Sequence, residues 1–107
     1  MLRKIALLAI PGVSPFEFGV VCEVFGIDRS DSGGPIFDFT IVTADPGRVP
    51  TSLGFDLTIA EDLSAAAEAD LIAVPAHTWH DVDERFLQVR QVFGAEGLVL
   101  VGLEVRV

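Results

Sequence analysis

The chain has little cysteine, few basic residues and no long apolar run. Cys22 is its single cysteine, which excludes an internal disulfide and a cysteine-based zinc cluster and agrees with a reducing cytoplasm. Lysine and arginine number 7 against 16 acidic residues, and the net charge of −9 would repel a phosphate backbone. No apolar stretch approaches the roughly 20 residues of a membrane span. The run at 3–10 is too short for a signal peptide and has no cleavage site. We therefore expect a cytoplasmic protein that neither binds DNA itself nor enters a membrane.

Apolar runs divide the chain into strand-sized pieces. The 107 residues are enough for one small domain, and half of them are hydrophobic. Runs without alternation predict strands that are covered on both faces of a sheet; they lie at 3–10, 71–75 and 98–101. Alternation at 37–44 predicts another strand. The segment 49–59 predicts a short hairpin or edge excursion, because Pro50 argues against a central strand.

The segment after the first run carries the signals of a helix start. Ser14 is a good N-cap, Pro15 fits the first helical position, and Glu17 completes a capping box. Gly26 suits the helix stop. At about 100° per residue the helix presents one apolar stripe with Glu17 in its middle; the stripe consists of Val20, Val21, Val24 and Phe25.

A carboxylate on the core side of a helix needs partners, since burying an unpaired charge is very costly. Two interpretations of Glu17 stay open. In the first, its side chain reaches back to the backbone of Ser14 and only closes the cap. In the second, it projects into a site and forms a hydrogen bond with a ligand or a nucleophile.

The order of elements predicts the fold class. An alanine-rich turn of helix is expected at 64–68, and a second capping box starts a helix at Asp81. The apolar residues of that helix are Val82, Phe86, Val89 and Phe93. This alternation is typical of an α/β fold with a doubly wound, mostly parallel sheet and helices on both faces, as in flavodoxin-like proteins. The ends of the strands at 3–10 and 71–75 should then lie side by side.

The last predicted strand, 98–101, needs a covering helix that the remaining residues do not supply. We therefore expect a fold that is incomplete at its C-terminus. Residues 1–107 would form either the front portion of a larger domain or a naturally shortened version that buries its last strand by self-association.

Three stretches together resemble a known family: IALLAIPGVSPFEFGVVCEVFGID at 5–28, FDFTIVTADPGRVPTSLGFDLTIAEDL at 37–63, and ADLIAVPA at 69–76. They are similar to the amino-terminal half of the class I glutamine-amidotransferase-like domain that precedes the DNA-binding region of many AraC-type transcriptional regulators. That domain is related to the PfpI/ThiJ proteins. Such regulators bind DNA through a carboxy-terminal pair of helix-turn-helix units, and no such DNA-binding domain is present in this sequence.

The resemblance implies a pocket and a missing nucleophile. Related hydrolases carry a cysteine on a sharp elbow after a strand, with an acidic residue of the first helix beside it. Glu17 matches that acidic position, and the loop of Pro75, Ala76 and His77 matches the one that lines the pocket and offers backbone N–H groups to an oxyanion. The elbow is expected directly after 98–101, yet residues 102–107 contain no Cys, Ser or Thr. The family's catalytic residue is therefore not expected here, and the protein is not expected to be an enzyme.

Other chemically capable residues have simpler interpretations. Cys22 lies 140° from Glu17 on the helical wheel and is expected to pack rather than react. The group of His77, His80, Asp81 and Asp83 has no helix to fix its spacing as a metal site. Gly33 and Gly34 lack nucleotide-binding spacing. We expect no metal and no cofactor.

The sequence thus predicts a ligand-sensing and dimerising domain of an AraC-type regulator, or a shortened remnant of one. Its pocket would lie at Glu17, Pro75, Ala76 and His77 and would bind a small-molecule effector without catalysis. A homodimer is expected, with DNA bound only through a region outside this chain. Two alternatives stay open: a PfpI/ThiJ-type cysteine hydrolase or hydratase, in which Glu17 acts beside a cysteine, and a structural homodimer without a ligand.

Overall fold

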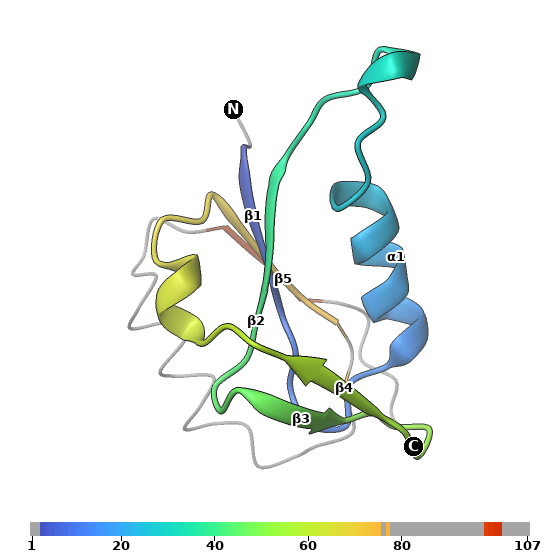
Figure 1. Ribbon diagram of the computed structural model, residues 1–107, viewed down its shortest axis with the longest axis vertical. Helices are drawn as coiled ribbons and strands as arrows, with labels where there is room; N and C mark the ends of the chain where they lie inside the picture. The colour runs from blue at the N-terminus through green and yellow to red at the C-terminus, as the bar shows by residue number, and fades with distance from the viewer. Residues whose placement is uncertain (1–2, 76, 78–97, 102–107) are drawn as a thin grey trace.

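The main sheet of the protein has four parallel strands (Figure 1). The computed structural model describes residues 3–75, 77 and 98–101. The strands are β1 (Lys4–Leu8), β2 (Asp38–Val42), β5 (Leu71–Val74) and β6 (Leu98–Val101), and their order in the sheet is β2-β1-β5-β6. Every neighbouring pair is parallel. This is the order of the first four strands of a flavodoxin-like sheet, so the predicted α/β fold class is confirmed.

The two central strands are buried on both faces, which explains why their sequences show no alternation. Ile5 to Leu8 in β1 and all four residues of β5 are buried. Parallel pairing aligns Leu7 with Ile41 on one side and with Ala73 on the other. Because side chains alternate along a strand, these three lie on one face of the sheet and their neighbours lie on the opposite face.

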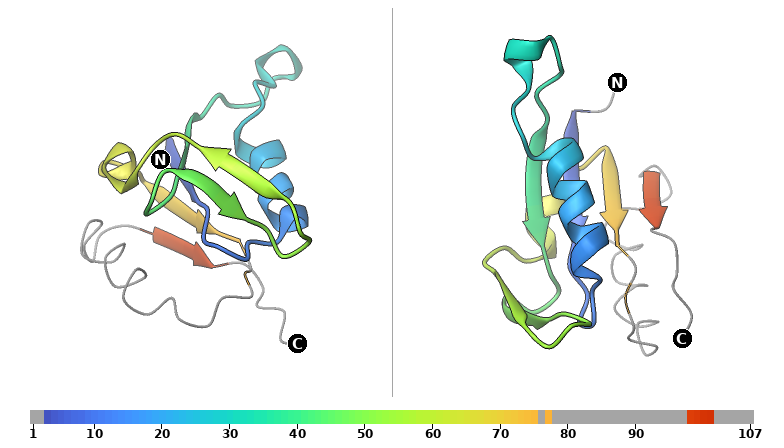
Figure 2. Two further views of the ribbon diagram at one scale, coloured as in Figure 1. Left: turned by 60° about the horizontal axis from the view of Figure 1, so that its bottom comes forward. Right: turned by 90° about the vertical axis from the view of Figure 1, so that its right-hand side faces the viewer.

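A helical segment covers each face of the sheet (Figure 2). Helix α1 (Pro15–Phe25) packs Phe18 against a buried cluster of Ala9, Val49 and Ile59. The short 3-10 helix η2 (Leu63–Ala66) buries Ala66 on the opposite face. Its cluster contains Ala6, Leu8, Ile10, Val42, Ala66, Ile72 and Val74. A second short 3-10 helix, η1 (Ser30–Ser32), lies in the loop between α1 and β2.

The predicted hairpin is present as a separate two-stranded antiparallel sheet. Strands β3 (Gly47–Pro50) and β4 (Asp56–Ile59) pair with each other and with no strand of the main sheet. Val49 and Ile59 are buried against Ala9, just beyond the end of β1. The hairpin therefore covers the carboxyl end of β1, which is where the candidate site was expected.

The predicted apolar stripe of α1 was right for Val21 and Phe25, which are half-buried, and wrong for Val20 and Val24. Val20 and Val24 are 44% and 54% exposed, whereas the half-buried positions centre on Phe18 and Phe25. Phe25 also makes an edge-on contact with Phe37, with ring centroids 5.2 Å apart.

Nearly every position of this helix is apolar, so the spacing alone did not fix the buried side. Size alone does not decide this, because Phe16 of the same helix is 78% exposed; Phe18 faces inward where it packs against the buried cluster of Ala9, Val49 and Ile59.

Several predictions fall outside the residues that the structure describes. These are Ala76, the helix that starts at Asp81 and the residues 102–107 that would carry the elbow. Within the described ranges, no helix combines the length and the apolar character needed to cross a bilayer.

Candidate functional site

The carboxyl ends of β1 and β5 lie side by side at the point where the chain changes direction in the sheet. From β1 the chain continues to β2 on one side, and from β2 it crosses over to β5 on the other. In open α/β sheets such a switch point leaves a crevice between the loops that follow the two strands. The prediction that the ends of these two strands lie side by side is confirmed. Val13, in the loop after β1, forms a β-bridge with His77, in the loop after β5.

The loop between β1 and α1 is fixed by backbone contacts to the hairpin. Gly12 has a φ of 84° and donates its N–H to the carbonyl of Pro50 at 2.8 Å. Val13 is fully buried, bridges Thr51, and accepts a hydrogen bond from the N–H of Ser52 at 3.0 Å. A left-handed φ is costly for residues with a side chain, so glycine is needed at position 12. These contacts hold the start of α1 at a defined place above the sheet.

A buried threonine, which the sequence analysis did not single out, ties β1 to β2 at the same end. Thr43 is 2% exposed, and its Oγ1 donates to the carbonyl of Ala9 at 2.7 Å. The N–H of Ala9 in turn donates to the carbonyl of Val42 at 2.9 Å. The signal in the sequence was a hydroxyl directly after the apolar end of a strand, Ile41 and Val42. This bond extends the pairing of the two strands up to the edge of the candidate site.

Glu17 lies in the first turn of α1, where the N-cap geometry is as predicted. The hydroxyl of Ser14 accepts a hydrogen bond from the N–H of Glu17 at 3.4 Å, and Pro15 occupies the first helical position. Glu17 is half-buried, at the border between the sheet-facing side of the helix and the exposed side. It therefore lies at the edge of the apolar stripe, not in its middle as predicted.

The loop after β5 supplies the other predicted site residues. Pro75 is buried, and His77 is half-buried and forms the bridge to Val13. Since proline has no N–H, Pro75 itself offers no oxyanion donor. The structure thus brings the segment of Pro75 and His77 against the loop that leads into the helix of Glu17. Ala76 lies outside the described residues.

Cys22 has the environment of a packing residue. It is half-buried on the side of α1 that carries Phe18 and Phe25. Burial, together with the nearby charge of Glu23, raises the pKa of its thiol. A raised pKa lowers the fraction of thiolate, which is the reactive form.

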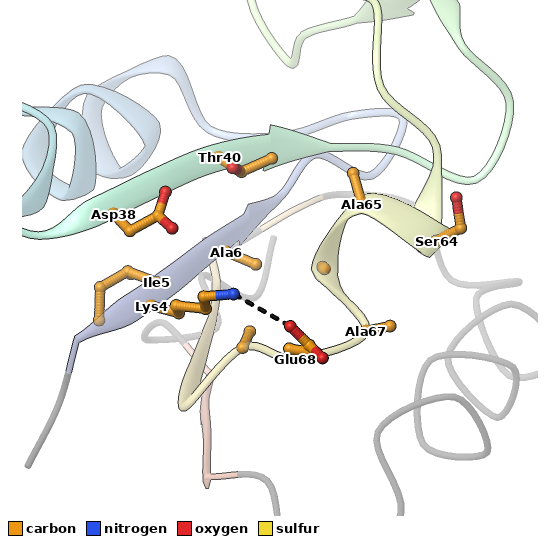
Figure 3. A pocket seen from close by; sticks show the side chains of 11 residues that line it. Lys4, Ile5, Ala6, Asp38, Thr40, Ser64, Ala65, Ala67 and Glu68 are labelled. Atoms are coloured by element: carbon orange, nitrogen blue, oxygen red, sulfur yellow. Dashed lines mark hydrogen bonds and ion pairs between the residues drawn. The ribbon is translucent and has the colours of Figure 1, made fainter.

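A separate cavity of about 280 Å³ lies at the other end of the sheet, near the start of β1 and β2 (Figure 3). Lys4, Asp38 and Glu68 contribute charges to its lining, and η2 contributes a row of alanines. The ammonium of Lys4 forms an ion pair with Glu68 at 3.0 Å, and the Glu68 side chain is 83% exposed. Lys4 and Glu68 are thus already paired at a solvated position, and we do not assign a ligand site here.

Metal binding finds no support in the described part of the chain. Within it, no group of three or more His, Cys, Asp or Glu side chains is placed to hold an ion. Three members of the histidine and aspartate group considered from the sequence, His80, Asp81 and Asp83, lie outside the described residues.

The fold and the position of the site define a class: a flavodoxin-like α/β domain with its candidate site at the β1/β5 switch point. No protein-family model and no curated protein matches the chain. Solved structures do match it. They include an AraC family transcriptional regulator from Pseudomonas putida, with a TM-score of 0.65 and 25% sequence identity over 92% of this chain.

Two further matches have lower sequence identity. A protein from Bacteroides thetaiotaomicron described as a candidate protease I has a TM-score of 0.67 at 18% identity over 94% of this chain. A DJ-1 superfamily protein from Salmonella typhimurium has a TM-score of 0.66 at 16% identity over 94% of this chain. The structural neighbours thus include DJ-1 superfamily proteins and an AraC family regulator, and the chain shares their fold.

The chain is shorter than these neighbours. It covers 62% of the Bacteroides protein and 55% of both the Pseudomonas regulator and the Salmonella protein. The fold is thus shared with 55–62% of the length of each of these three proteins. What the whole neighbouring proteins do is a separate question from this shared fold.

Proposed function

We propose that the chain is the ligand-sensing and dimerising domain of an AraC-type transcriptional regulator, acting in the cytoplasm and binding a small metabolite without catalysis. The ligand site would be formed by Glu17, Pro75, Ala76 and His77. One observation supports this site above the others: the bridge between Val13 and His77, which brings the loop after β5 against the start of α1. The likeness to the Pseudomonas regulator supports the regulatory class. DNA would be bound by a helix-turn-helix region outside this chain.

The side chains define the chemistry of the proposed ligand. The carboxylate of Glu17 accepts hydrogen bonds from an amine or an amide, and the imidazole of His77 can donate or accept one. Val13 and Pro75 are buried apolar residues of the two loops that meet here. A small molecule that carries an amine or amide group next to a short apolar part fits this combination.

A cysteine hydrolase is the less supported alternative. Its thiol would have to lie beside Glu17, and the single cysteine of the chain is instead half-buried among the sheet-facing residues of α1. Its pKa is raised, the opposite of what an activated nucleophile requires.

The experiment is a thermal-shift screen of small amides, amines and amino-acid derivatives, followed by titration of each active compound against two variants. Glu17→Gln keeps the shape of the side chain and removes its charge. Because a hydrogen bond to a charged group contributes about 1.5–3 kcal/mol, binding should weaken tenfold or more. Glu23→Gln is the matched control, since Glu23 lies on the exposed side of the same helix and contacts Arg29.

Unchanged affinity in Glu17→Gln would contradict the proposed site. If no compound shifts the melting temperature while the chain remains folded and dimeric, the structural homodimer becomes the better description. Loss of binding in both variants would indicate a general effect on α1 and not a site at Glu17.

A further inference from the structure

Ala9 is the residue at which three parts of the framework around the candidate site meet. It lies directly after β1, is 1% exposed, and forms a buried cluster with Val49 and Ile59 of the hairpin. Figure 1 shows this hairpin across the carboxyl end of β1. Phe18 of α1 packs against the same cluster, and it follows Glu17 directly in the chain. The place of Ala9 therefore fixes where the hairpin and the first turn of α1 lie relative to the sheet.

The end of β2 holds Ala9 through both of its backbone polar groups. The paired register of β1 and β2 ends at Leu8 and Val42. Beyond it, the N–H of Ala9 donates to the carbonyl of Val42 at 2.9 Å, and the carbonyl of Ala9 accepts the hydroxyl of Thr43 at 2.7 Å. In a parallel ladder, a backbone N–H of the neighbouring strand normally makes this second bond. Here the side chain of Thr43 makes it, so the hold on the carbonyl of Ala9 depends on one hydroxyl group.

The backbone of Thr43 is held from the opposite side. Its N–H donates to the carbonyl of Glu61 at 3.0 Å, and Val42 forms a β-bridge with Glu61. The segment after β4 thus borders the end of β2 on the side away from β1. With its backbone held there and only 2% of the residue exposed, Thr43 keeps its hydroxyl directed at Ala9. The same burial keeps Thr43 out of reach of a ligand, so its effect on binding must pass through the groups that it contacts.

The segment that follows Ala9 leads to the proposed site. The N–H of Gly12 donates to the carbonyl of Pro50 in the hairpin, and Val13 bridges His77. Residues 9–13 are therefore held at their start by β2 and at their end by the hairpin and the loop after β5. Loss of the bond from Thr43 would release the start of this segment.

We propose that Thr43 is a positioning residue of the ligand site: its hydroxyl holds Ala9 and thereby sets where the first turn of α1 lies relative to the loop of His77. This inference rests on the proposed function and adds to it a residue that touches no ligand. A segment that is free to take several positions has the binding-competent one only part of the time, and the apparent affinity falls by that fraction. Contacts that hold the segment in advance avoid this loss.

Thr43→Val tests the hydroxyl with little change in side-chain volume. Dissociation constants are measured by NMR titration in the cold, after circular dichroism has verified that each variant is folded. The probes are isobutyramide, which carries an amide beside a short apolar part, and the compound with the largest thermal shift in the screen. Thr43→Val should bind both at least about fivefold more weakly than the wild type. Thr40→Val, the same replacement within β2 beside the amino-end cavity, is the matched control and should bind as the wild type does.

Thr43→Ser and Thr43→Ala form a second pair, which differs only in the hydroxyl and replaces the first pair if valine prevents folding. Serine loses the methyl group and with it some stability, yet it keeps the donor, so its affinity should match that of the wild type. Alanine should bind as weakly as valine. A purely structural role predicts instead that all folded variants bind equally, or that serine and alanine lose affinity alike. Either result would overturn the proposal.

Hydrogen exchange of the backbone amides gives a readout without any compound. The N–H of Gly12 should exchange at least about tenfold faster in Thr43→Val than in the wild type and in Thr43→Ser, because residues 9–13 open more readily. Unchanged exchange at Gly12 would contradict the positioning role. If the wild type binds none of the compounds, the proposed function fails and this inference fails with it. If the wild type binds and Thr43→Val binds equally well, only this inference fails.

Discussion

The two ends of the parallel sheet differ in how their polar groups are satisfied. At the carboxyl end, the N–H groups of Gly12 and Ser52 and the hydroxyl of Thr43 all bond to backbone carbonyls, and Thr43 is buried. At the amino end, the carboxylate of Asp70 accepts bonds from the N–H groups of Arg3 and Lys4 at 3.1 and 2.9 Å in full contact with water.

This difference predicts that the two ends of the sheet respond differently to the loss of a hydrogen bond. A buried hydrogen bond that loses one partner leaves an unsatisfied polar group, which costs about 1–3 kcal/mol. An exposed bond is exchanged for a bond to water at little cost. The carboxyl end should therefore be sensitive to small changes, as expected of a site that must hold its shape, and the amino end should tolerate them.

The largest effect on stability is expected when threonine is replaced by valine at the carboxyl end of the sheet. The same replacement at the amino end serves as the comparison. Thr43→Val removes the hydroxyl that bonds Ala9 and should lower the free energy of unfolding by about 1–3 kcal/mol. Thr40→Val changes a half-buried residue of β2 that lines the amino-end cavity, and its effect should stay within about 0.5 kcal/mol. Urea denaturation of both variants measures the two values. Equal losses would remove the distinction between the two ends.

A somewhat smaller loss is expected at Gly12. Gly12→Ala forces a side chain into a left-handed conformation and should cost about 1–2 kcal/mol of unfolding free energy. Gly12→Asn should cost less, because asparagine tolerates this conformation better than other residues with a side chain. The two variants are compared by urea denaturation. If alanine is tolerated as well as asparagine, the loop is not held as described.

The smallest effect is expected at Asp70, and it depends on pH. Hydrogen bonds from the backbone N–H groups of Lys4 and Arg3 lower the pKa of this carboxyl below its usual value. Its contribution to stability is therefore present above pH of about 4 and is lost as the pH falls through the lowered pKa. Asp70→Asn should be slightly less stable than the wild type near neutral pH and equal to it in acid. A difference that grows in acid would contradict this sign.

The strands and the start of α1 were predictable from the sequence because their signals are local. Uniformly apolar runs occur only where both faces of a strand are covered, as in β1 and β5. Ser14, Pro15 and Glu17 each satisfy a requirement of a helix N-terminus independently of the rest of the fold.

The orientation of α1 and the bonding of Thr43 were not predictable in this way. A helix with apolar residues on nearly all sides gives no periodic signal. The inward face is selected by tertiary contacts, which pack Phe18 against a buried cluster and Phe25 against Phe37. The partner of Thr43 lies 34 residues away in the sequence, at Ala9. The candidate site was predicted from the parallel order of strands and from the family resemblance, and the ligand-binding role of Glu17, Pro75, Ala76 and His77 stays a prediction.

The proposed ligand site is tested most directly by mapping which backbone amides respond when a compound binds. Amide ¹H–¹⁵N spectra would be recorded while the strongest compound from the thermal-shift screen is added. If the ligand binds at Glu17 and His77, the largest shift changes should occur at residues 12–18 and at His77, with residues 4, 38 and 68 of the amino-end cavity unchanged. Shift changes centred on that cavity, with 12–18 and His77 unaffected, would contradict the proposed ligand site.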